Sequence, residues 1–302
     1  MGIARLGGIE PGRFGVFAGP LNDKPSEVQR EFARRMERLG YGTLWVGEGV
    51  GPEIFARSAI LLAATEQLVV ASGIANIWAR DPTAMANGGR TLAEAFPDRF
   101  ILGVGVGHAP AVRARGHDYS RPFSAMQEYL PAMETAPWRG VAAPMPPVVL
   151  AALGPRMATL AGTRTAGAYP YFTTVEHVRE VRGLLGDDPF LAADLPVVIA
   201  PSLEAARAVG NRHLAFYLGA ENYRNNLLRI GWQTGDLEPP GSAELFDAIV
   251  AWGEPERIAA KTDERFAAGA DQVVFNLLGP DPAVPPLAEL ETVASIVGLR
   301  PR

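Results

Sequence analysis

The stretch that most constrains the fold is residues 68–108, where two nearly all-apolar segments enclose one helical pattern. Residues 68–71 (LVVA) begin the first segment, and residues 100–108 (FILGVGVGH) form the second. A helix is predicted between them over residues 81–95, because an Asp-Pro pair is a typical helix start. Strands that are apolar on both faces belong to parallel sheets, whose crossovers are usually helical. We therefore expect a βαβ unit whose functional groups lie at the carboxyl ends of its strands, at residues 73–80 and 105–108.

Apolar segments of this kind recur along the chain and are mostly separated by helical patterns. With 302 residues and 48% hydrophobic residues, the chain can bury one large core. Eight strands alternating with helices predict an α/β protein with a single (β/α)8 TIM barrel, one domain over residues 1–302 with its core at about 14–278. An open doubly wound sheet is disfavoured, since no Gly-x-Gly-x-x-Gly follows a strand and opens a helix. The expected strands are residues 14–18, 43–46, 68–71, 100–108, 148–152, 167–172, 196–200 and 272–276.

The connecting segments are predicted from caps and breakers. Ser26 is the expected N-cap of the first helix, and residues 110–119 are expected to be irregular. The other expected helices include residues 53–67, 175–185, 203–230 with a break near Gly219, 243–252 and 255–268.

Composition excludes several classes of function. The net charge of −5 and the lack of clustered Lys and Arg argue against nucleic acid as a partner. The absence of cysteine excludes disulfides and thiolate chemistry, and the four histidines lack metal-ligand spacing, so no metal site is expected. No apolar run reaches the length of about 18 residues needed for a membrane span, and residues 1–12 lack a signal-peptide core. We therefore expect a cytoplasmic protein with no membrane partner.

Gly154, Pro155 and Arg156 lie between a predicted strand and a predicted helix. Backbone N–H groups at a helix N-terminus bind anions, and Arg156 could add a positive charge. The alternative is a plain connecting loop with a surface arginine.

Small and polar residues interrupt the third strand at residues 72–76 (SGIAN). A glycine there indicates either a bulge that lets a flat ligand approach the backbone or a relief of crowding inside the barrel. Trp78 and Arg80 follow and could form a pocket wall, although a loop tryptophan often packs on the scaffold.

His108 and Glu48 are the candidate acid–base groups, because each follows a predicted strand end. Histidine can exchange a proton near neutral pH, and a carboxylate can act as an acid or a base. The alternatives are a structural histidine and a carboxylate that caps a neighbouring helix.

Six short motifs resemble the luciferase-like monooxygenase superfamily, and within it the actinobacterial proteins described as probable coenzyme F420-dependent oxidoreductases. Each motif is short, but their order and spacing together are specific, and the similarity covers residues 14–278. The motifs are residues 39–48 (LGYGTLWVGE), 73–82 (GIANIWARDP), 99–105 (RFILGVG), 152–157 (ALGPRM), 213–218 (HLAFYL) and 223–227 (YRNNL).

The resemblance implies a (β/α)8 barrel with F420, or alternatively FMN, at its carboxyl face. The cofactor ring would lie against a bulge in the third strand, often with a non-prolyl cis peptide, and its phosphate would lie beside Gly154, Pro155 and Arg156. The residues that the resemblance places around the cofactor are Ser72, Gly73, Ile74, Asn76, Gly105, Gly107, His108, Gly154, Pro155 and Arg156.

Two departures from the family pattern concern the remaining walls of the site. Many F420-dependent relatives carry a histidine after the second strand, in a Trp-x-x-x-His pattern, where this chain has Glu48 and Gly49. Near Gly167 the subgroup tends to show Asp-Gly and a histidine, whereas this chain places Tyr169 there. Tyr169, Trp78 and Arg80 are therefore the expected substrate-pocket residues.

The sequence thus predicts an oxidoreductase that transfers hydride between F420 and a small organic substrate, with His108 as proton donor and Glu48 as the second choice. An FMN-dependent monooxygenase of the same fold is the alternative. A non-catalytic cofactor-binding protein and a cofactor-free barrel hydrolase also remain open. Relatives often form dimers, so a homodimer is the assembly to test.

Overall fold

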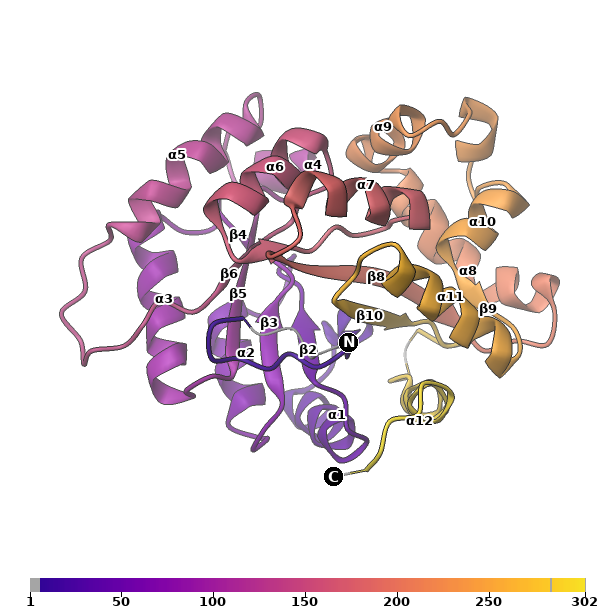
Figure 1. Cartoon of the computed structure of the whole chain (residues 1–302), viewed down its shortest axis with the longest axis horizontal. Coiled ribbons are helices and arrows are strands. Elements are labelled where there is room, and N and C mark those ends of the chain that lie inside the picture. Colours follow the sequence, from indigo (N-terminus) through magenta and orange to yellow (C-terminus); the bar gives the residue numbers. More distant parts are fainter. Residues whose placement is uncertain (1–5, 283, 302) are drawn as a thin grey trace.

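The computed structural model describes residues 6–282 and 284–301, and these form a closed barrel of eight parallel strands surrounded by helices (Figure 1). Each strand pairs with the next around the ring, and β10 pairs with both β8 and β1, which closes it. The predicted (β/α)8 barrel is confirmed. The ring consists of β1 (Phe14–Phe17), β2 (Thr43–Val46), β3 (Val69–Ser72), β5 (Phe100–Gly105), β6 (Val148–Leu150), β7 (Gly167–Ala168), β8 (Phe190–Val198) and β10 (Gln272–Leu277).

Two short strands extend the sheet: β4 (Ala75–Asn76) pairs with β5, and β9 (Ala251–Trp252) pairs with β8. Helices α8, α9 and α10 lie together at one side of the barrel (Figure 1). The helices are α1 (Ser26–Arg38), α2 (Ile54–Leu62), α3 (Pro82–Ala95), α4 (Ala109–Ala114), α5 (Pro122–Glu134), α6 (Pro155–Arg164), α7 (Val175–Leu185), α8 (Leu203–Leu218), α9 (Glu221–Arg229), α10 (Ala243–Ile249), α11 (Pro255–Ala267) and α12 (Leu287–Ile296), with 3-10 turns at Gly19–Leu21 and Thr234–Leu237.

Side chains from alternate strand positions fill the inside of the barrel, as in other parallel barrels. The indole N–H of Trp45 donates to Oε1 of Gln272 at 2.8 Å, and the Gln272 amide donates to the Pro11 carbonyl at 2.7 Å. The ring of Trp45 also packs 4.4 Å from that of Tyr169. The polar groups of Trp45 and Gln272 are therefore paired inside this layer, which forms the base on which the carboxyl-end loops rest. The interior side chains are Leu6, Ile9, Trp45, Val69, Ala71, Ile101, Val149, Tyr169, Phe190, Ala192 and Val274.

Two strands differ most from the sequence expectation, whereas the bounds of the others differ by three residues or fewer. The strand predicted at residues 196–200 begins earlier, as β8, and the strand predicted at residues 167–172 ends after two residues, as β7. Asp194 explains both differences, because its buried carboxylate accepts the backbone N–H of Phe172 at 3.2 Å. Phe172 has a φ of +56°, so the chain turns there, after β7 has ended at Ala168. An aspartate that resembles a strand breaker in the sequence is held inside the strand by this bond.

The helix expected over residues 53–67 ends early, as α2, because another side chain binds the backbone that would continue it. The carboxylate of Glu37 accepts the N–H groups of Gln67 at 2.6 Å and Leu68 at 2.8 Å. At its start, Glu53 caps the helix by accepting the Ala56 N–H at 2.8 Å. The residues near its start therefore predicted correctly where this helix begins, but the prediction of where it ends was wrong.

Three other expectations about helices need correction. Ser26 is the first helical residue after Pro25 and makes no capping hydrogen bond. Residues 110–119 were expected to be irregular, but α4 forms at their start because Pro110 lies in its first turn, where no N–H is needed. The helix expected over residues 243–252 ends at Ile249, as α10, and the residues after it form β9.

None of the helices in the part of the chain that the structure describes is long and apolar enough to cross a membrane.

Candidate functional site

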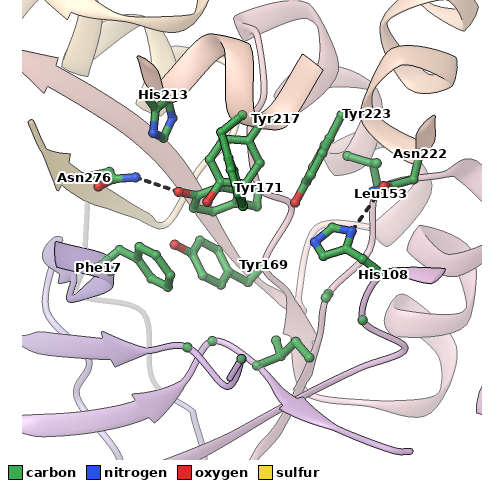
Figure 2. A pocket seen from close by; sticks show the side chains of 18 of the residues that line it. Phe17, His108, Leu153, Tyr169, Tyr171, His213, Tyr217, Asn222, Tyr223 and Asn276 are labelled. Atoms are coloured by element: carbon green, nitrogen blue, oxygen red, sulfur yellow. Dashed lines mark hydrogen bonds between the residues drawn. The ribbon is translucent and has the colours of Figure 1, made fainter. Parts of the chain in front are cut away.

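A cavity of about 930 Å³ opens at the carboxyl ends of the barrel strands. Its lining comes from the loops after β1, β2, β3, β5, β6, β7 and β10 and from helices α8 and α9. The carboxyl face is where parallel barrels carry their active sites, so this cavity is the candidate functional site. Figure 2 shows ten of its side chains by name.

One wall of the cavity is a bulge between β3 and β4, where the Gly73–Ile74 peptide bond is cis. The Ser72 hydroxyl donates to the Gly103 carbonyl at 2.8 Å, and the Gly73 N–H donates to the Val46 carbonyl at 2.7 Å. A Cβ on Gly103 would lie 1.8 Å from the Ser72 carbonyl oxygen. The expected third-strand bulge is present, and glycine in the neighbouring strand β5 makes room for it. We call residues 72–76 the platform.

Glu48 lies beside the platform and is fully engaged in binding it. Its carboxylate accepts the Asn76 N–H at 2.7 Å and pairs with the guanidinium of Arg80, which also reaches Glu53 at 3.0 Å. The side chains of Glu48 and Arg80 are only 5% and 10% exposed. Arg80 was expected to line a pocket, but the structure places it behind Glu48, where it neutralises the buried carboxylate.

Trp78 packs on the scaffold, which was the alternative reading of this residue. Its indole N–H donates to the Val106 carbonyl at 3.0 Å, and its backbone N–H donates to Oδ1 of Asn76 at 2.9 Å. The neighbouring Tyr119, whose hydroxyl donates to the Gly107 carbonyl at 2.8 Å, reaches the cavity instead.

His108 lines the cavity at the start of α4, and its Nδ1 lies 3.2 Å from Oδ1 of Asn222 on α9 (Figure 2). An amide oxygen only accepts hydrogen bonds, so Nδ1 carries the proton in this pair. In the neutral ring, Nε2 is then left as an acceptor. Nε2 of His108 is therefore the ring nitrogen that is left to exchange a proton with a ligand.

The first turn of α6 borders the cavity through Gly154, Pro155 and Met157. A Cβ on Gly154 would have no heavy atom within 4 Å, so the backbone is open on the cavity side. Arg156 behaves differently from the expectation: its guanidinium lies 4.0 Å over the Phe123 ring, and the residue does not line the cavity.

A polar face of α9 lines the cavity together with the start of α6, and the sequence analysis did not assign it. Its residues are spaced i, i+3, i+4 and i+7, which places them on one side of a helix. Asn226 accepts from Arg229 at 2.8 Å, and Arg229 also pairs with Glu180 at 2.6 Å. This helical spacing was readable in the sequence. The face consists of Asn222, Asn225, Asn226 and Arg229.

The wall that faces the platform is aromatic, and we call it the tyrosine wall (Figure 2). Tyr171 is at its centre, with its ring 5.3 Å from Phe17 and 5.0 Å from Tyr217. Asn276, at the end of β10, donates to the Tyr171 hydroxyl at 2.6 Å. Of this wall only Tyr169 was predicted, although the His213–Tyr217 spacing of four residues places both on one helix face. The tyrosine wall consists of Phe17, Tyr169, Tyr171, His213, Tyr217 and Tyr223.

Burial keeps the tyrosine wall uncharged at neutral pH. It raises the pKa of Tyr169, Tyr171 and Tyr223 well above the ordinary value and that of Tyr217 to about 12. Burial also lowers the pKa of His213 to about 3. No ionised side chain of this wall is available to pair with a charged ligand.

The cavity brings together part of the predicted site. Those predicted residues that line it are Glu48, Gly73, Ile74, Gly107, His108, Gly154, Pro155 and Tyr169. The predicted residues outside its lining are Ser72, Asn76, Trp78, Arg80, Gly105 and Arg156. Ser72 and Asn76 are the two ends of the platform, and Gly105 lies against its Ile74 side chain.

Known proteins share both the sequence pattern and the fold. The model of the luciferase-like monooxygenase family matches residues 12–272. The uncharacterized protein Rv1360 of Mycobacterium tuberculosis is 26% identical over 261 residues, which cover 71% of this chain and 75% of that protein.

Two solved structures share the fold at 15% identity. An F420-dependent secondary alcohol dehydrogenase in complex with an F420-acetone adduct has a TM-score of 0.74 and covers 95% of this chain and 98% of its own. The oxygenating constituent of 3,6-diketocamphane monooxygenase from Pseudomonas putida, in complex with FMN, has a TM-score of 0.70, with coverages of 94% and 98%. Because the family model spans nearly the whole barrel, the chain belongs to the luciferase-like monooxygenase family.

Proposed function

We propose that this protein is an oxidoreductase that binds F420 at the platform and transfers hydride between the deazaflavin and a small organic substrate. The observation that carries the proposal is the bulge at Gly73 and Ile74, because both residues line the cavity. Glycine lets a flat ring approach the backbone closely. The F420-dependent alcohol dehydrogenase of the same fold supports the choice of cofactor.

The residues around the cavity fit such a cofactor at both ends. The platform and Gly107 provide backbone surface for the ring, and the open first turn of α6 at Gly154 provides N–H groups for the phosphate. The polar face of α9 adds amide donors and Arg229 beside the same loop. When bound, the deazaflavin supplies the hydride donor or acceptor.

The protein's own contribution is to position the two reactants, exclude water and move one proton. We assign this proton transfer to Nε2 of His108, because Nδ1 is engaged with Asn222 and Nε2 is the ring nitrogen that can accept the proton and, once protonated, donate it. Glu48 is the weaker candidate, since Arg80 and the Asn76 N–H already occupy its carboxylate. His108→Ala is expected to abolish turnover while cofactor binding persists, and unchanged turnover would contradict the assignment.

The test is a titration of the purified protein with F420 and FMN in parallel, followed by fluorescence and thermal shift. We expect micromolar binding of F420 and FMN binding at least about tenfold weaker. Preference for FMN, together with oxygen consumption by the reduced FMN complex, would replace the proposal with a monooxygenase. Binding of neither cofactor would contradict both functions.

A further inference from the structure

Helices α7 and α9 are joined by two pairs of side chains, spaced three residues apart on each helix (Figure 1). In the first pair, the Arg229 guanidinium donates to both carboxylate oxygens of Glu180, at 2.6 and 2.7 Å. In the second pair, the side-chain amide nitrogen of Asn226 lies 3.4 Å from Nδ1 of His177. Arg229 also donates to Asn226 at 2.8 Å, so the two pairs form one hydrogen-bond network.

The donors in this network fix the tautomer of the His177 ring. A guanidinium only donates, so Oδ1 of Asn226 faces Arg229 and its Nδ2 faces His177. On the other side of the ring, Nε2 lies 2.8 Å from the carbonyl oxygen of Leu153, which only accepts. Nε2 therefore carries the proton, and Nδ1 accepts from Asn226. Burial lowers the pKa of His177, which keeps the ring neutral at pH 7.

The bond to Leu153 determines which way the next peptide group faces. Leu153 and Gly154 line the cavity, whereas His177 is 1% exposed and does not. The Leu153–Gly154 bond is trans, and in a trans peptide group the C=O and N–H bonds point in opposite directions. Because the Leu153 carbonyl points to His177 behind the loop, the Gly154 N–H points toward the cavity.

A glycine at this position makes the orientation of the peptide group easy to lose. Gly154 has no side chain to restrict its backbone, and a Cβ there would meet no heavy atom within 4 Å. A rotated peptide group would turn the Leu153 carbonyl oxygen into the cavity, where its partial negative charge repels an anion. The hydrogen bond from His177 opposes this rotation.

We propose that His177 is a positioning residue: by binding the Leu153 carbonyl it holds the Gly154 N–H toward the cavity, where this group binds the anionic part of a ligand. Asn226 keeps the ring in the required tautomer, and Arg229, which lines the cavity, adds further N–H donors. The inference rests on the proposed function, which places the cofactor phosphate at the start of α6.

The first measurement uses the protein without any cofactor. Long-range ¹H–¹⁵N NMR spectra of the protein labelled with ¹⁵N-histidine show which ring nitrogen of each of the four histidines carries the proton. We expect His177, assigned by the loss of its signals in His177→Phe, to be protonated at Nε2 alone at pH 7. A proton on Nδ1 would overturn the inference.

The second measurement compares F420 with the 8-hydroxy-5-deazaflavin ribityl compound that lacks its phosphate-linked tail, both titrated by fluorescence against the full-length protein. His177→Phe should weaken the binding of F420 about tenfold and that of the phosphate-free compound less than about twofold. His177→Gln keeps a donor for the Leu153 carbonyl and should bind F420 within about threefold of the wild type. The matched control is His117→Phe, because His117 packs 5.7 Å from Trp78 and does not line the cavity.

Two results of this comparison would overturn the inference. Equal losses for the two compounds in His177→Phe would show that the variant loosens the whole site rather than one end of it. A His177→Gln protein as weak as His177→Phe would show that the hydrogen bond to Leu153 is not what matters.

A third measurement separates the inference from the proposed function. Inorganic phosphate is titrated into protein labelled with ¹³C at leucine carbonyls and ¹⁵N in glycine, so that only glycines following a leucine are observed. We expect the Gly154 amide to shift in the wild type and the shift to be lost in His177→Phe. A Gly154 amide that does not respond in the wild type would overturn the inference, whereas a failure to bind F420 alone would contradict the proposed function.

Discussion

The platform and the tyrosine wall face the same cavity but are built in opposite ways. In the platform, the Ser72 hydroxyl, the Glu48 carboxylate and the Asn76 amide oxygen all have hydrogen-bond partners within the protein. The tyrosine wall and the layer behind it contain several buried polar atoms that have no hydrogen-bond partner among the described residues. These are Oη of Tyr169, Nε2 of His213, Oγ1 of Thr173, Oδ1 of Asp194, and Nε and Nη1 of Arg265.

The difference separates a preformed surface from one that is completed by what it binds. A surface whose polar groups are already paired keeps its shape and suits a group that must always lie in one position. Unpaired groups favour a ligand that supplies the missing hydrogen bonds and reject one that does not. This division agrees with the proposed cofactor site on the platform and with a ligand that completes the hydrogen bonds of the tyrosine wall.

The largest expected effect comes from removing the space that the platform needs. Gly103→Ala places a Cβ 1.8 Å from the Ser72 carbonyl, a contact that only backbone movement can relieve. We expect a loss of more than about 4 kcal/mol in the free energy of unfolding, or no soluble protein. The control is Gly183→Ala in α7, where no heavy atom lies within 4 Å and a gain of up to about 1 kcal/mol is expected. Denaturant unfolding measures both, and equal stabilities would show that the platform is not rigid.

The next effect concerns the ion pair that fixes the platform. Arg80→Met leaves the Glu48 carboxylate buried without its cation, which should cost about 3–5 kcal/mol. Arg164→Met removes an arginine from an exposed pair with Glu134, whose side chains are 42% and 50% exposed, and should cost less than about 1 kcal/mol. Similar unfolding free energies for the two variants would mean that Glu48 does not need Arg80.

The smallest effect tests the tyrosine wall through pH. Burial raises the pKa of Asp194 to about 7, although the hydrogen bond from the Phe172 N–H and the charge of Arg265 both act to lower this pKa. Between about pH 4 and 7 the folded protein therefore holds a proton that the unfolded chain has released, so Asp194 destabilises the fold progressively as pH rises. Relative to the wild type, Asp194→Asn should gain about 2 kcal/mol in unfolding free energy between pH 5 and pH 7.

The wild type is compared with Asp194→Asn because the titration of His213 changes the unfolding free energy in the opposite direction as pH rises. Its lowered pKa makes stability rise with pH up to about 6.5 in both proteins, and this contribution cancels in the difference. Denaturant unfolding at pH 5, 6 and 7 provides the measurement. A constant difference between the two proteins across this range would show that Asp194 is ionised in the fold and paired with Arg265.

Local sequence patterns predicted the barrel because its strands and helices depend on neighbours in the chain. At residues 72–76 the pattern left both a bulge and a relief of crowding open, and the family resemblance favoured the bulge. The apolar segment ending at Ser72 and the glycines of β5 lie within one βαβ unit, so this part of the sequence alone indicated where both strands lie. The capping aspartate at residue 81 was equally local and does accept the Ala84 N–H at 2.9 Å.

The tyrosine wall was mostly missed because its contacts join distant segments. Tyr171, Tyr217 and Asn276 come from three separate parts of the chain, and the sequence of one part does not indicate which residues of the others it contacts. The same reason explains Arg156 and Arg80. Their positive charges suggested binding roles, whereas Phe123 and Glu48, distant in sequence, determine where these side chains lie.

Because the last strand, β10, closes the barrel, it also determines at which stage of folding the site can form. Phe14 pairs with Val273, Trp45 bonds to Gln272, and Tyr171 bonds to Asn276, so the first half of the barrel, its interior and the tyrosine wall all depend on β10. Contacts this distant in sequence form slowly and require a long loop to close. During synthesis, which proceeds from the N-terminus, the earlier strands can collapse before β10 is available. The cavity therefore appears only in the final step of assembly, and a partly made chain has no binding site to occupy.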